Sequence, residues 1–400
     1  MRWQAGTLGS AITDAKPGFA CGETAEGGVF QIRMNNITKD GVVDLTKIRR
    51  IPRSKCSLES FQLRTGDVLF NATNSPELVG KSAVFEDCGE PTVFSNHFLR
   101  LRSDEKKLDS RFLARWLQLQ FQSKVFRNMC RQWVNQATVG RDALLALKLP
   151  LPPVDEQRQI AAVLDQAEAL RVKRCEALNC LEELPQAIFI EVFGEPSSNP
   201  KGWPEELYLN DVADIHSGIT IGRKTTGKNT HPVPYLAVAN VQDKRLDLSR
   251  VKTVEATEDE IERYHLQVDD LLLTEGGDPD KLGRGALWKE EIVDCIHQNH
   301  IFRVRLKSDY ILPTFLSWII GSSRGKRYFL RSAKQTTGIA SINMTQLRRF
   351  PIFVPSIDLQ RQFAQRVEAV DRMKASYRAH LTELDTLFAS LQYRAFRGEL

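Results

Sequence analysis

The sequence lacks the features that define several protein classes. Its seven cysteines are an odd number and include no Cys-x-x-Cys pair, which argues against a disulfide framework and a zinc ribbon and favours reduced thiols. The N-terminus has no apolar segment typical of a secretory signal, and no apolar run reaches the roughly 18 residues of a membrane span. We therefore expect a cytoplasmic protein that does not contact a membrane.

Catalytic motifs are also scarce. An adenine methyltransferase needs an Asn/Asp-Pro-Pro-aromatic loop, and the nearest string, at 199–202, lacks the second proline and the aromatic residue. In the stretch 218–225 the second glycine comes one residue too early for a phosphate loop, and the glycines at 276–277 and 283–285 flank a loop rather than a strand-to-helix turn. We expect no catalytic residue, no metal site and no cofactor in this chain.

Composition narrows the class without fixing the function. A length of 400 residues predicts two or three domains, and 42% hydrophobic with 26% charged residues is typical of a globular protein. The formal net charge of +5 is compatible with binding to a polyanion, but many enzymes are as basic.

The chain repeats itself at a constant offset. His97, Arg100 and Arg102 of SNHFLRLR correspond to His300, Arg303 and Arg305 of QNHIFRVR, an offset of 203 residues (300 − 97 = 203). The same offset relates Asp44 to Asp247, Asp67 to Asp270, Asp155 to Asp358, Gln157 to Gln360, Arg158 to Arg361, Gln159 to Gln362, and Phe193 to Phe396. Chance does not hold one register over this distance, so the chain is a tandem duplication.

Each copy has the same internal order. Short β-type runs (VFQIRM, DVLFNAT and HFLRLR against YLAVAN, DLLLTE and HIFRVRL) precede a helical patch, a proline-marked strand and a long helix. This order predicts an α+β fold: two repeated domains, each with a short, mixed, barrel-like β-sheet and small helices, joined by two long helices. The predicted boundaries are 1–153 for the first domain, 154–195 for the central helix, 196–203 for a linker, 204–355 for the second domain and 356–400 for the C-terminal helix.

Both long helices carry a heptad seam. In the second copy we expect it at Phe363, Val367, Val370, Lys374, Tyr377, Leu381, Leu384, Phe388 and Leu391. In the first copy we expect it at Ile160, Val163, Ala167, Leu170, Arg174, Ala177, Leu181 and Leu184. An antiparallel coiled coil would bury both seams and place the domains at opposite ends, in inverted orientation; separate packing of each helix on its own domain is the alternative.

The helix ends carry their own signals. Asp155 and Asp358 follow the prolines and are expected to be N-caps, and Pro185 is expected to end or kink the first helix near Leu184.

The polar loops that differ between the copies are the candidate binding sites. Residues 71–75 occupy the place of 274–278, and 136–141 that of 339–344. Their amides and hydroxyls could read base edges and nearby Arg and Lys could contact phosphates or guanine, although ordinary turns have the same composition. The candidate DNA-binding residues are Asn71, Thr73, Asn74, Lys81, Gln136, Thr138, Arg141, Lys224, Thr274, Lys281, Arg284, Ser341 and Asn343.

The repeated strand also presents basic side chains. We expect His97 and His300 to be buried core residues rather than catalytic or metal-binding ones. The four arginines that alternate along this strand, Arg100, Arg102, Arg303 and Arg305, could form salt bridges or contact phosphates.

Together these motifs resemble a known family. Two GD-V/L-L strands, two N-H strands, two proline exits (LPLPPVDEQRQI and FVPSIDLQRQF) and two helices ending in VFGE and AFRGEL are similar to the specificity subunit of type I restriction-modification systems. The resemblance covers essentially the whole chain. Pro185, and the Ser-Ile-Asp that follows Pro355 in place of a second proline, depart from the pattern and bear on the helix lengths.

The resemblance implies a non-catalytic subunit. Two target recognition domains would each read half of a bipartite DNA sequence, with the helices setting the spacing. The implied partners are double-stranded DNA, two modification subunits that bind S-adenosylmethionine, and restriction subunits that use ATP and Mg²⁺. We expect the modification subunits to dock on helix positions such as Glu168, Arg171 and Lys173. A single-chain methyltransferase or restriction enzyme with an unrecognised site, and a decoy that docks on modification subunits without binding DNA, remain alternatives.

Overall fold

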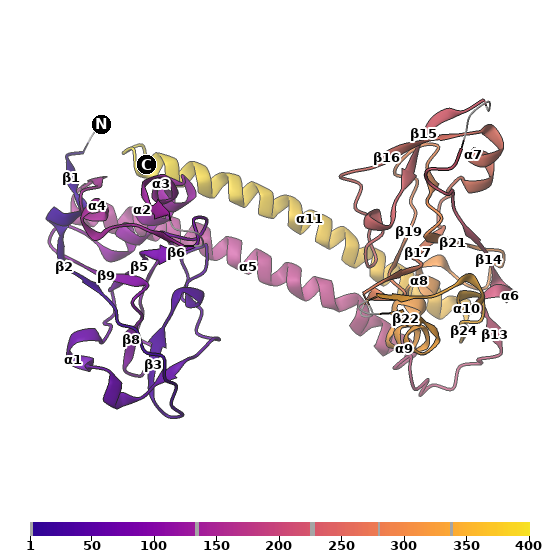
Figure 1. The fold of residues 1–400 in the computed structure, drawn as a ribbon, viewed down its shortest axis with the longest axis horizontal. Coiled ribbons are helices and arrows are strands. Elements are labelled where there is room, and N and C mark those ends of the chain that lie inside the picture. Colours follow the sequence, from indigo (N-terminus) through magenta and orange to yellow (C-terminus); the bar gives the residue numbers. More distant parts are fainter. Residues whose placement is uncertain (1–2, 133–135, 225–228, 279–280, 337–338) are drawn as a thin grey trace. The chain divides into compact units, whose positions relative to one another are not determined.

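The computed structural model describes residues 3–132, 136–224, 229–278, 281–336 and 339–400 (Figure 1). The chain divides into two compact units. Unit 1 comprises Met1–Glu176 and Arg378–Leu400, and unit 2 comprises Ala177–Tyr377. The long helices α5 (Val154–Phe193) and α11 (Ile357–Ala395) each contribute one part to each unit.

Unit 1 is built on a four-stranded antiparallel sheet. Its order is β2 (Ile12–Pro17), β9 (Phe98–Ser103), β5 (Val68–Asn71) and β7 (Ser82–Val84). A second sheet pairs β4 (Arg50–Ile51), β3 (Val29–Ile32) and β8 (Thr92–Phe94), the last two in parallel, and β1 (Ala5–Thr7) pairs with β12 (Lys148–Pro150). The short helices are α1 (Leu58–Phe61), α2 (Ser110–Gln122), α3 (Val125–Met129) and α4 (Arg141–Leu145).

Unit 2 repeats this architecture strand for strand. The four-stranded sheet runs β14 (Ala213–Ser217), β21 (Ile301–Leu306), β17 (Leu271–Thr274) and β19 (Gly285–Leu287). The second sheet contains β16 (Lys252–Ala256), β15 (His231–Leu236) and β20 (Ile296–His297), and β13 (Leu207–Tyr208) pairs with β24 (Pro351–Ile352). The short helices are α6 (Leu209–Val212), α7 (Glu258–Tyr264), α8 (Pro313–Gly321), α9 (Ser323–Ser332) and α10 (Met344–Arg348).

Strand register confirms the duplication. Val68 pairs with Leu101 between β5 and β9, and Leu271 pairs with Val304 between β17 and β21, which is the same pairing moved by 203 residues. β5 and β17 are buried along their whole length because both faces of the strand are covered. The α+β fold with two repeated domains and paired long helices is therefore as the sequence predicts.

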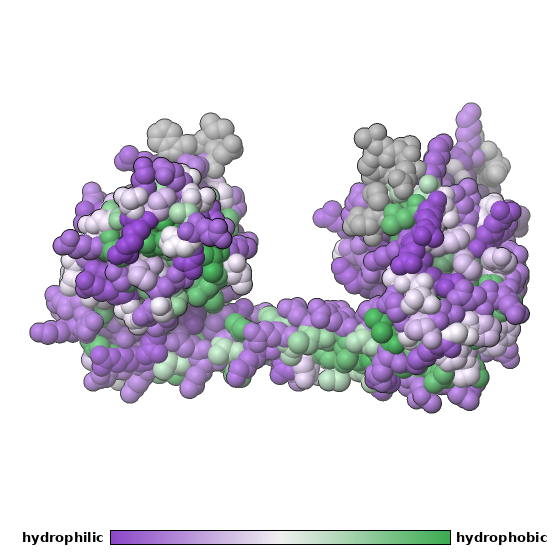
Figure 2. Space-filling view, turned by 90° about the horizontal axis from the view of Figure 1, so that it is seen from below, coloured by the Kyte–Doolittle hydropathy of each residue, from purple (hydrophilic) through white to green (hydrophobic). Residues whose placement is uncertain are grey.

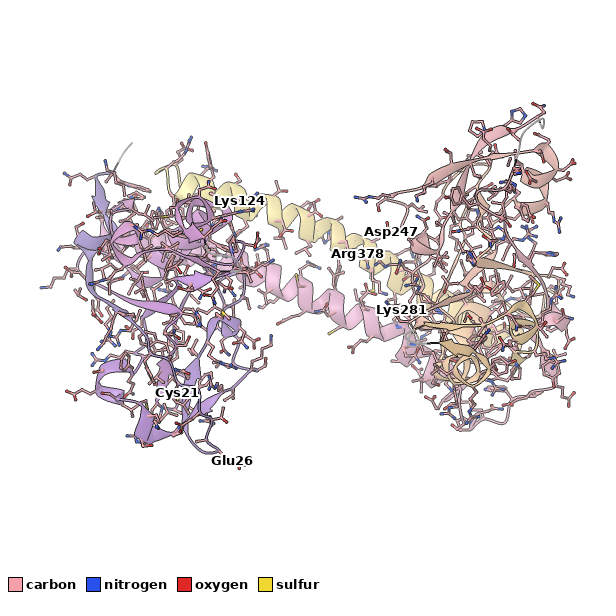
Figure 3. All side chains as sticks on the ribbon, viewed as in Figure 1. Cys21, Glu26, Lys124, Asp247, Lys281 and Arg378 are labelled. Atoms are coloured by element: carbon pink, nitrogen blue, oxygen red, sulfur yellow. The ribbon has the colours of Figure 1, made fainter. Side chains whose placement is uncertain are left out.

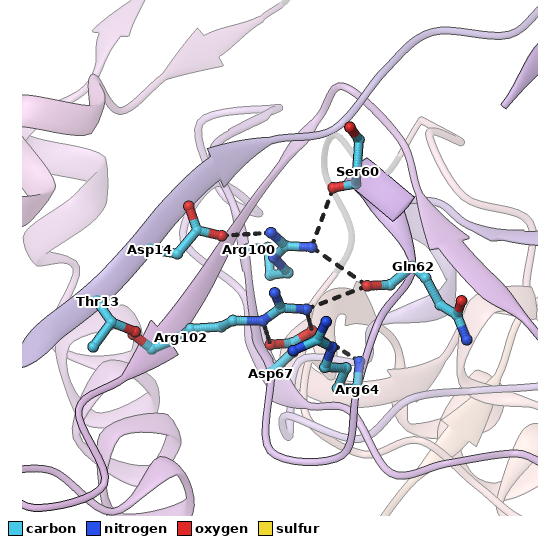
Figure 4. Close-up of polar contacts among 8 residues, drawn as sticks. All are labelled: Thr13, Asp14, Ser60, Gln62, Arg64, Asp67, Arg100 and Arg102. Atoms are coloured by element: carbon cyan, nitrogen blue, oxygen red, sulfur yellow. Dashed lines mark hydrogen bonds and ion pairs between the residues drawn. The ribbon is translucent and has the colours of Figure 1, made fainter. Parts of the chain in front are cut away.

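A buried ion pair, repeated in both units, explains the shared spacing of the Asp and Arg residues, and Figure 4 shows the pair of unit 1. In unit 1, Arg102 binds Asp67 through Nε (2.6 Å) and Nη2 (3.0 Å), and Asp67 also accepts a hydrogen bond from the Arg64 amide (2.9 Å). In unit 2, Arg305 binds Asp270 through Nε (2.7 Å) and Nη2 (2.6 Å).

The other two arginines, Arg100 in β9 and Arg303 in β21, also bind groups of the scaffold. Arg100 pairs with Asp14 and donates to the carbonyls of Ser60 and Gln62. Arg303 donates to the carbonyls of Arg263 (3.2 Å) and His265 (3.0 Å). The four strand arginines therefore brace the fold: Arg100, Arg102 and Arg305 form salt bridges, and Arg303 binds backbone carbonyls.

The long helices pair antiparallel inside each unit. In unit 1, Arg171 binds Asp385 (2.7 Å), and in unit 2, Lys374 binds Glu182 (3.0 Å). The residue numbers along α5 therefore rise as those of its partners along α11 fall. The C-terminal end of each long helix packs on the domain of the other repeat. Phe396, after α11, packs on Phe112 of unit 1 (ring centroids 5.1 Å apart), and Phe193 of α5 packs on Phe315 of unit 2 (5.0 Å).

The seam of α11 is confirmed, whereas that of α5 differs from our expectation. Every predicted α11 position is buried or half-buried. On α5, Val163, Leu170 and Leu184 are 41%, 55% and 40% exposed. The side chains that face inward include Ile160, Leu164, Ala167, Arg171, Leu181, Pro185 and Ile188. Their steps of four and three residues start in the opposite phase, and they are the residues that the 203-residue offset relates to the seam of α11.

Pro185 does not end α5. The helix continues to Phe193, because Ile188, Phe189 and Phe193 are buried in the core of unit 2. A proline inside a helix costs about 3 kcal/mol through the missing hydrogen bond and the clash with the preceding turn. Burial of three large apolar side chains, worth about 1.5–3 kcal/mol each, exceeds that cost.

Glutamine, not aspartate, fixes the start of each long helix. α5 begins at Val154 and α11 at Ile357, so Asp155 and Asp358 lie inside the first turn, exposed, and pair with Arg158 (3.1 Å) and Arg361 (3.2 Å). The expected N-cap role of these aspartates was wrong.

The buried glutamines one turn into each helix make three hydrogen bonds. Gln157 Oε1 accepts from the Asp109 amide (2.9 Å), and Nε2 donates to the carbonyls of Lys107 (2.7 Å) and Pro152 (2.8 Å). Gln360 repeats this set with the Leu312 amide (2.8 Å) and the carbonyls of Tyr310 (3.0 Å) and Pro355 (3.0 Å). Each side chain thereby ties a long helix to the domain that precedes it.

Candidate functional site

The polar stretches that differ between the copies meet in one small sheet per unit. In unit 1, β6 (Thr73–Asn74), β11 (Ala137–Thr138) and β10 (Arg131–Gln132) form a sheet in which β11 is central. In unit 2, β18 (Gly276–Gly277), β23 (Ile339–Ser341) and β22 (Lys334–Thr336) form the equivalent sheet with β23 in the centre. We call these the two polar sheets. Each joins segments that lie more than 60 residues apart in the sequence, as the registers Thr73↔Thr138 and Gly276↔Ser341 show.

In unit 1, hydroxyls and amides hold the polar sheet together. The Oγ1 atoms of Thr73 and Thr138 lie 3.1 Å apart, in hydrogen-bonding distance across the β6–β11 pair. Asn71 is fully buried and donates from Nδ2 to the carbonyls of Thr73 and His97 (3.2 Å each). Asn74 donates to Asn71 Oδ1 (2.5 Å), so the two amides form a chain that fixes the β5–β6 turn.

The other unit 1 candidates differ in access to solvent. Lys81 is buried, and its ammonium donates to the carbonyls of Met34 (3.0 Å) and Ile37, while burial lowers the pKa of Lys81. Gln136, at the edge of the polar sheet, and Arg141, the first residue of α4, are exposed. Only exposed side chains can meet an external ligand without a rearrangement of the core.

In unit 2, a carboxylate precedes the first strand of the polar sheet. Thr274 is buried at the end of β17. The next residue, Glu275, binds His300 Nδ1 (2.6 Å), and its backbone carbonyl accepts from the Ile342 amide (2.9 Å). Ser341 is half-buried, and Asn343 is exposed and caps α10 by accepting from the Gln346 amide (2.9 Å).

The histidine expectation was wrong for His300. Its side chain is 56% exposed and lies in the turn before β21, where it pairs with Glu275, and His97 is half-buried. The fully buried histidine is His297, whose Nδ1 lies 3.2 Å from the Tyr264 carbonyl. Burial lowers the pKa of His297 to about 4.

Glu275 was missed as a site residue; its place opposite Ala72 in the repeat was the available signal.

The basic candidates of unit 2 are accessible. Lys224 and Lys281 are exposed, and Arg284 is half-buried and donates from Nη1 to Gln242 Oε1 (3.2 Å). Lys281 pairs with Asp278 at the edge of β18, and it is labelled with Asp247 in Figure 3.

The repeated aspartates Asp44 and Asp247 have a local structural role. Hydrogen bonds from Thr46 and Ser249, respectively, lower the pKa of each carboxyl.

Surface and charge features complete the picture. The visible face of each unit is mostly hydrophilic (Figure 2). Within the part of the chain that the structure describes, no three His, Cys, Asp or Glu residues are placed to hold a metal ion, and no helix could span a bilayer. All seven cysteines are free. Glu168 and Arg171, expected as exposed docking positions, lie in the helix seam instead, where they bind each other (2.7 Å); Lys173 is exposed.

Comparison with known sequences gives a consistent result. The family profile described as "Type I restriction modification DNA specificity domain" matches residues 27–182 and 200–384. The chain is 24% identical over 389 residues to the type I restriction enzyme StySPI specificity subunit of Salmonella potsdam, covering 92% of this chain and 82% of the relative. It is also 24% identical to the EcoKI specificity subunit of Escherichia coli K12, with the same two coverages.

Comparison with solved structures supports the fold. A chain from a study of complex assembly and conformational transition of the type I R-M system aligns with a TM-score of 0.63 at 19% identity, over 100% of this chain and 98% of that one. The type I restriction-modification S subunit from M. genitalium aligns with a TM-score of 0.57 at 16% identity, over 99% of this chain and 96% of that one. At these identities the likeness concerns the fold alone.

Proposed function

Because the chain belongs to the type I restriction-modification DNA specificity family, we propose that it recognises a bipartite DNA sequence through its two polar sheets. The observation that carries this proposal is the pairing of two distant polar stretches at the same place in both units, on scaffolds of identical strand register. A duplicated scaffold with different polar side chains is what two half-sites of different sequence require.

The candidates for base and phosphate contact are the accessible side chains. In unit 1 these are Thr73, Asn74, Gln136, Thr138 and Arg141, and in unit 2 they are Lys224, Lys281, Arg284, Ser341 and Asn343. Asn71, Lys81 and Thr274 support the sheets from within, because their side chains are buried. Hydroxyls and amides would read base edges in a groove, while Lys and Arg would set the position on the backbone.

The domain boundaries proposed from the sequence divide these roles. Residues 1–153 and 204–355 would each read one half-site, while 154–195 and 356–400 would form the spacer and 196–203 the linker.

Partner subunits would supply the chemistry. Modification subunits with S-adenosylmethionine would methylate adenine, and restriction subunits with ATP and Mg²⁺ would cleave DNA, while this chain provides recognition without a catalytic residue of its own. A methylation assay with the purified chain and S-adenosylmethionine tests this division of labour: no methyl transfer is expected until modification subunits are added, and transfer by the chain alone would contradict it.

A domain exchange tests recognition directly. Residues 1–153 are replaced by the equivalent block of a relative, the complex is expressed in a host, and methylated adenines are sequenced. Only one half of the methylated motif should change. A change in both halves, or in neither, would contradict modular reading.

A further inference from the structure

Unit 2 contains a positively charged hollow beside its polar sheet. Arg245, Lys281, Arg284 and Lys326 line it, together with Gln242, Asp243, Leu282, Gly283 and Gly321. Among the described residues, four cations and one carboxylate therefore line the hollow, and the neighbouring Asp278 pairs with Lys281. The hollow adjoins β18: a Cβ atom added to Gly277 would lie 3.9 Å from Lys281 Cβ.

The walls of the hollow are fixed by the scaffold. The turn that carries Gln242 and Arg245 is held to β19 by the Lys244 amide, which donates to the Gly285 carbonyl (2.9 Å), and to α8 by Lys244 Nζ, which donates to the Ser317 carbonyl (2.5 Å). Arg284 is held by Gln242 (3.2 Å). Its Nε is buried and has no hydrogen-bond partner among the described residues.

Unit 1 does not repeat the charge of this hollow, although its backbone is equivalent: its hollow beside Val42 and Gln118 is lined by two cations, Arg111 and Arg115, and two carboxylates, Glu86 and Asp165. The positions of Arg245, Lys281 and Lys326 are taken by Val42, Leu78 and Ser123. The position of Arg284 is taken by Lys81, whose ammonium points to buried carbonyls. Gln118 stands where unit 2 has Gly321, and its amide donates to the Asp40 carbonyl (2.9 Å).

We infer that the hollow of unit 2 binds a phosphate of the DNA backbone, next to the bases that its polar sheet reads, and that unit 1 has no equivalent anchor. A phosphodiester matches the chemistry of the hollow, because guanidinium and ammonium groups form charge-assisted hydrogen bonds with its oxygens. The inference rests on the proposed function and adds an asymmetry to it: unit 2 carries more of the salt-dependent, sequence-independent affinity.

The test measures how DNA affinity depends on salt. The full-length chain is titrated with a fluorescent random-sequence duplex of 40 base pairs over a series of NaCl concentrations, and the slope of log K against log [NaCl] is determined. The test variant is the double substitution Arg245→Gln and Lys326→Gln, at two exposed positions. The matched control is Lys252→Gln, which removes an exposed cation of unit 2 on β16, outside the hollow.

We expect the double variant to bind more weakly at low salt and to have a slope shallower by about one, the value for one lost phosphate contact, while Lys252→Gln keeps the wild-type slope. A wild-type slope in the double variant, or an equal decrease in the control, would overturn the hollow as a phosphate site. Absence of DNA binding by the wild-type chain, alone and with modification subunits, would instead overturn the proposed function. Circular dichroism of each variant confirms that the fold is retained.

Discussion

In both units a side-chain hydrogen bond links a turn to a helix, but the donor lies on the helix in unit 1 and on the turn in unit 2. In unit 1, Gln118 of α2 reaches the Asp40 carbonyl next to Gly41 (φ 79°). In unit 2 the positions are reversed: Lys244, at φ 57°, reaches from the turn to α8, and the helix has Gly321 in place of the glutamine. Duplication has preserved the backbone, including a left-handed turn residue that glycine adopts most easily, while the linking side chain has moved to the other partner.

This difference shows how a recognition scaffold can change its surface without changing its fold. Burial of Lys244 disfavours its charged form and lowers its pKa to about 8. Gly321, in turn, makes room for Lys244, because a Cβ atom at this position would lie 2.5 Å from Lys244 Nζ. The units share the strand register and the buried Asp–Arg pairs, and they differ in the side chains around the polar sheets.

The largest predicted effect tests the part that the units share. Asp67→Ala and Asp270→Ala each remove a carboxylate that is at most 2% exposed and leave Arg102 or Arg305 without its bidentate partner. We expect each substitution to lower the free energy of unfolding by about 3 kcal/mol, at the lower end for a broken buried pair because the arginines retain some contact with water. Urea unfolding of the full chain measures this.

The comparison between the copies sharpens this experiment. Equal losses in the two variants are expected because the contacts are equivalent, and Asp358→Ala, which removes an exposed carboxylate, is the control with no measurable loss. A loss in one copy at least twice that in the other would show that the shared cores are not energetically equivalent.

The second prediction concerns pH and separates the units. His297 in β20 corresponds to Phe94 in β8, so only unit 2 has a titratable group at this buried position. The folded-state pKa of His297, about 4, lies below the ordinary 6.5 because burial disfavours the imidazolium. The unfolded chain therefore binds more protons between pH 6.5 and 4, and the stability present above pH 6.5 is lost as the pH falls through this window.

The size of this pH effect follows from the shift in the pKa of His297, and the residue of unit 1 supplies the control. A difference of about 2.5 pKa units corresponds to about 3 kcal/mol of stability lost from unit 2 by pH 4. His297→Phe, which copies the residue of unit 1, should remove this part of the pH dependence. Thermal unfolding from pH 7.5 to 4 compares the two proteins, and an unchanged pH profile in the variant would contradict the prediction.

Most of the scaffold could be predicted because the duplication supplies two readings of one structure. The offset located the strands, the ion-pairing arginines and the α11 seam. The α5 seam was misplaced because Arg171, Arg174 and Pro185 occupy three of its inward positions, so that counting apolar residues favoured the wrong phase. Transferring the α11 seam through the 203-residue offset would have given the correct one.

The candidate site was predictable in place but not in orientation. The polar stretches do meet, yet composition could not show that Asn71, Lys81 and Thr274 turn inward, because a polar side chain after a strand can satisfy buried carbonyls as well as face solvent. Arg245 and Lys326 were missed since they lie outside the two stretches; their replacement by Val42 and Ser123 in the other copy was the signal.

The smallest effect tests the charged positions of the helix seam. Arg171 binds Glu168 and Asp385, and the offset relates this set to Lys374 with Asp371 and Glu182. The two sets differ in burial: the side chain of Glu168 is 8% exposed, whereas those of Asp371 and Glu182 are 64% and 52% exposed. Truncation of the cation therefore leaves a buried carboxylate without this partner in unit 1, whereas the carboxylates in unit 2 are exposed.

Substitution of each cation, Arg171 and Lys374, by leucine tests this difference in burial. Arg171→Leu should lower the free energy of unfolding by about 2 kcal/mol, because the unpaired Glu168 stays buried. Lys374→Leu should leave it unchanged or raise it by up to about 1 kcal/mol, because an apolar side chain replaces an ammonium in an apolar seam. Chemical unfolding followed by helical circular dichroism measures both, and Arg171→Leu with Glu168→Gln should recover part of the loss. Equal losses for the two leucine variants would mean that burial of the acidic partner does not govern the energy of these pairs.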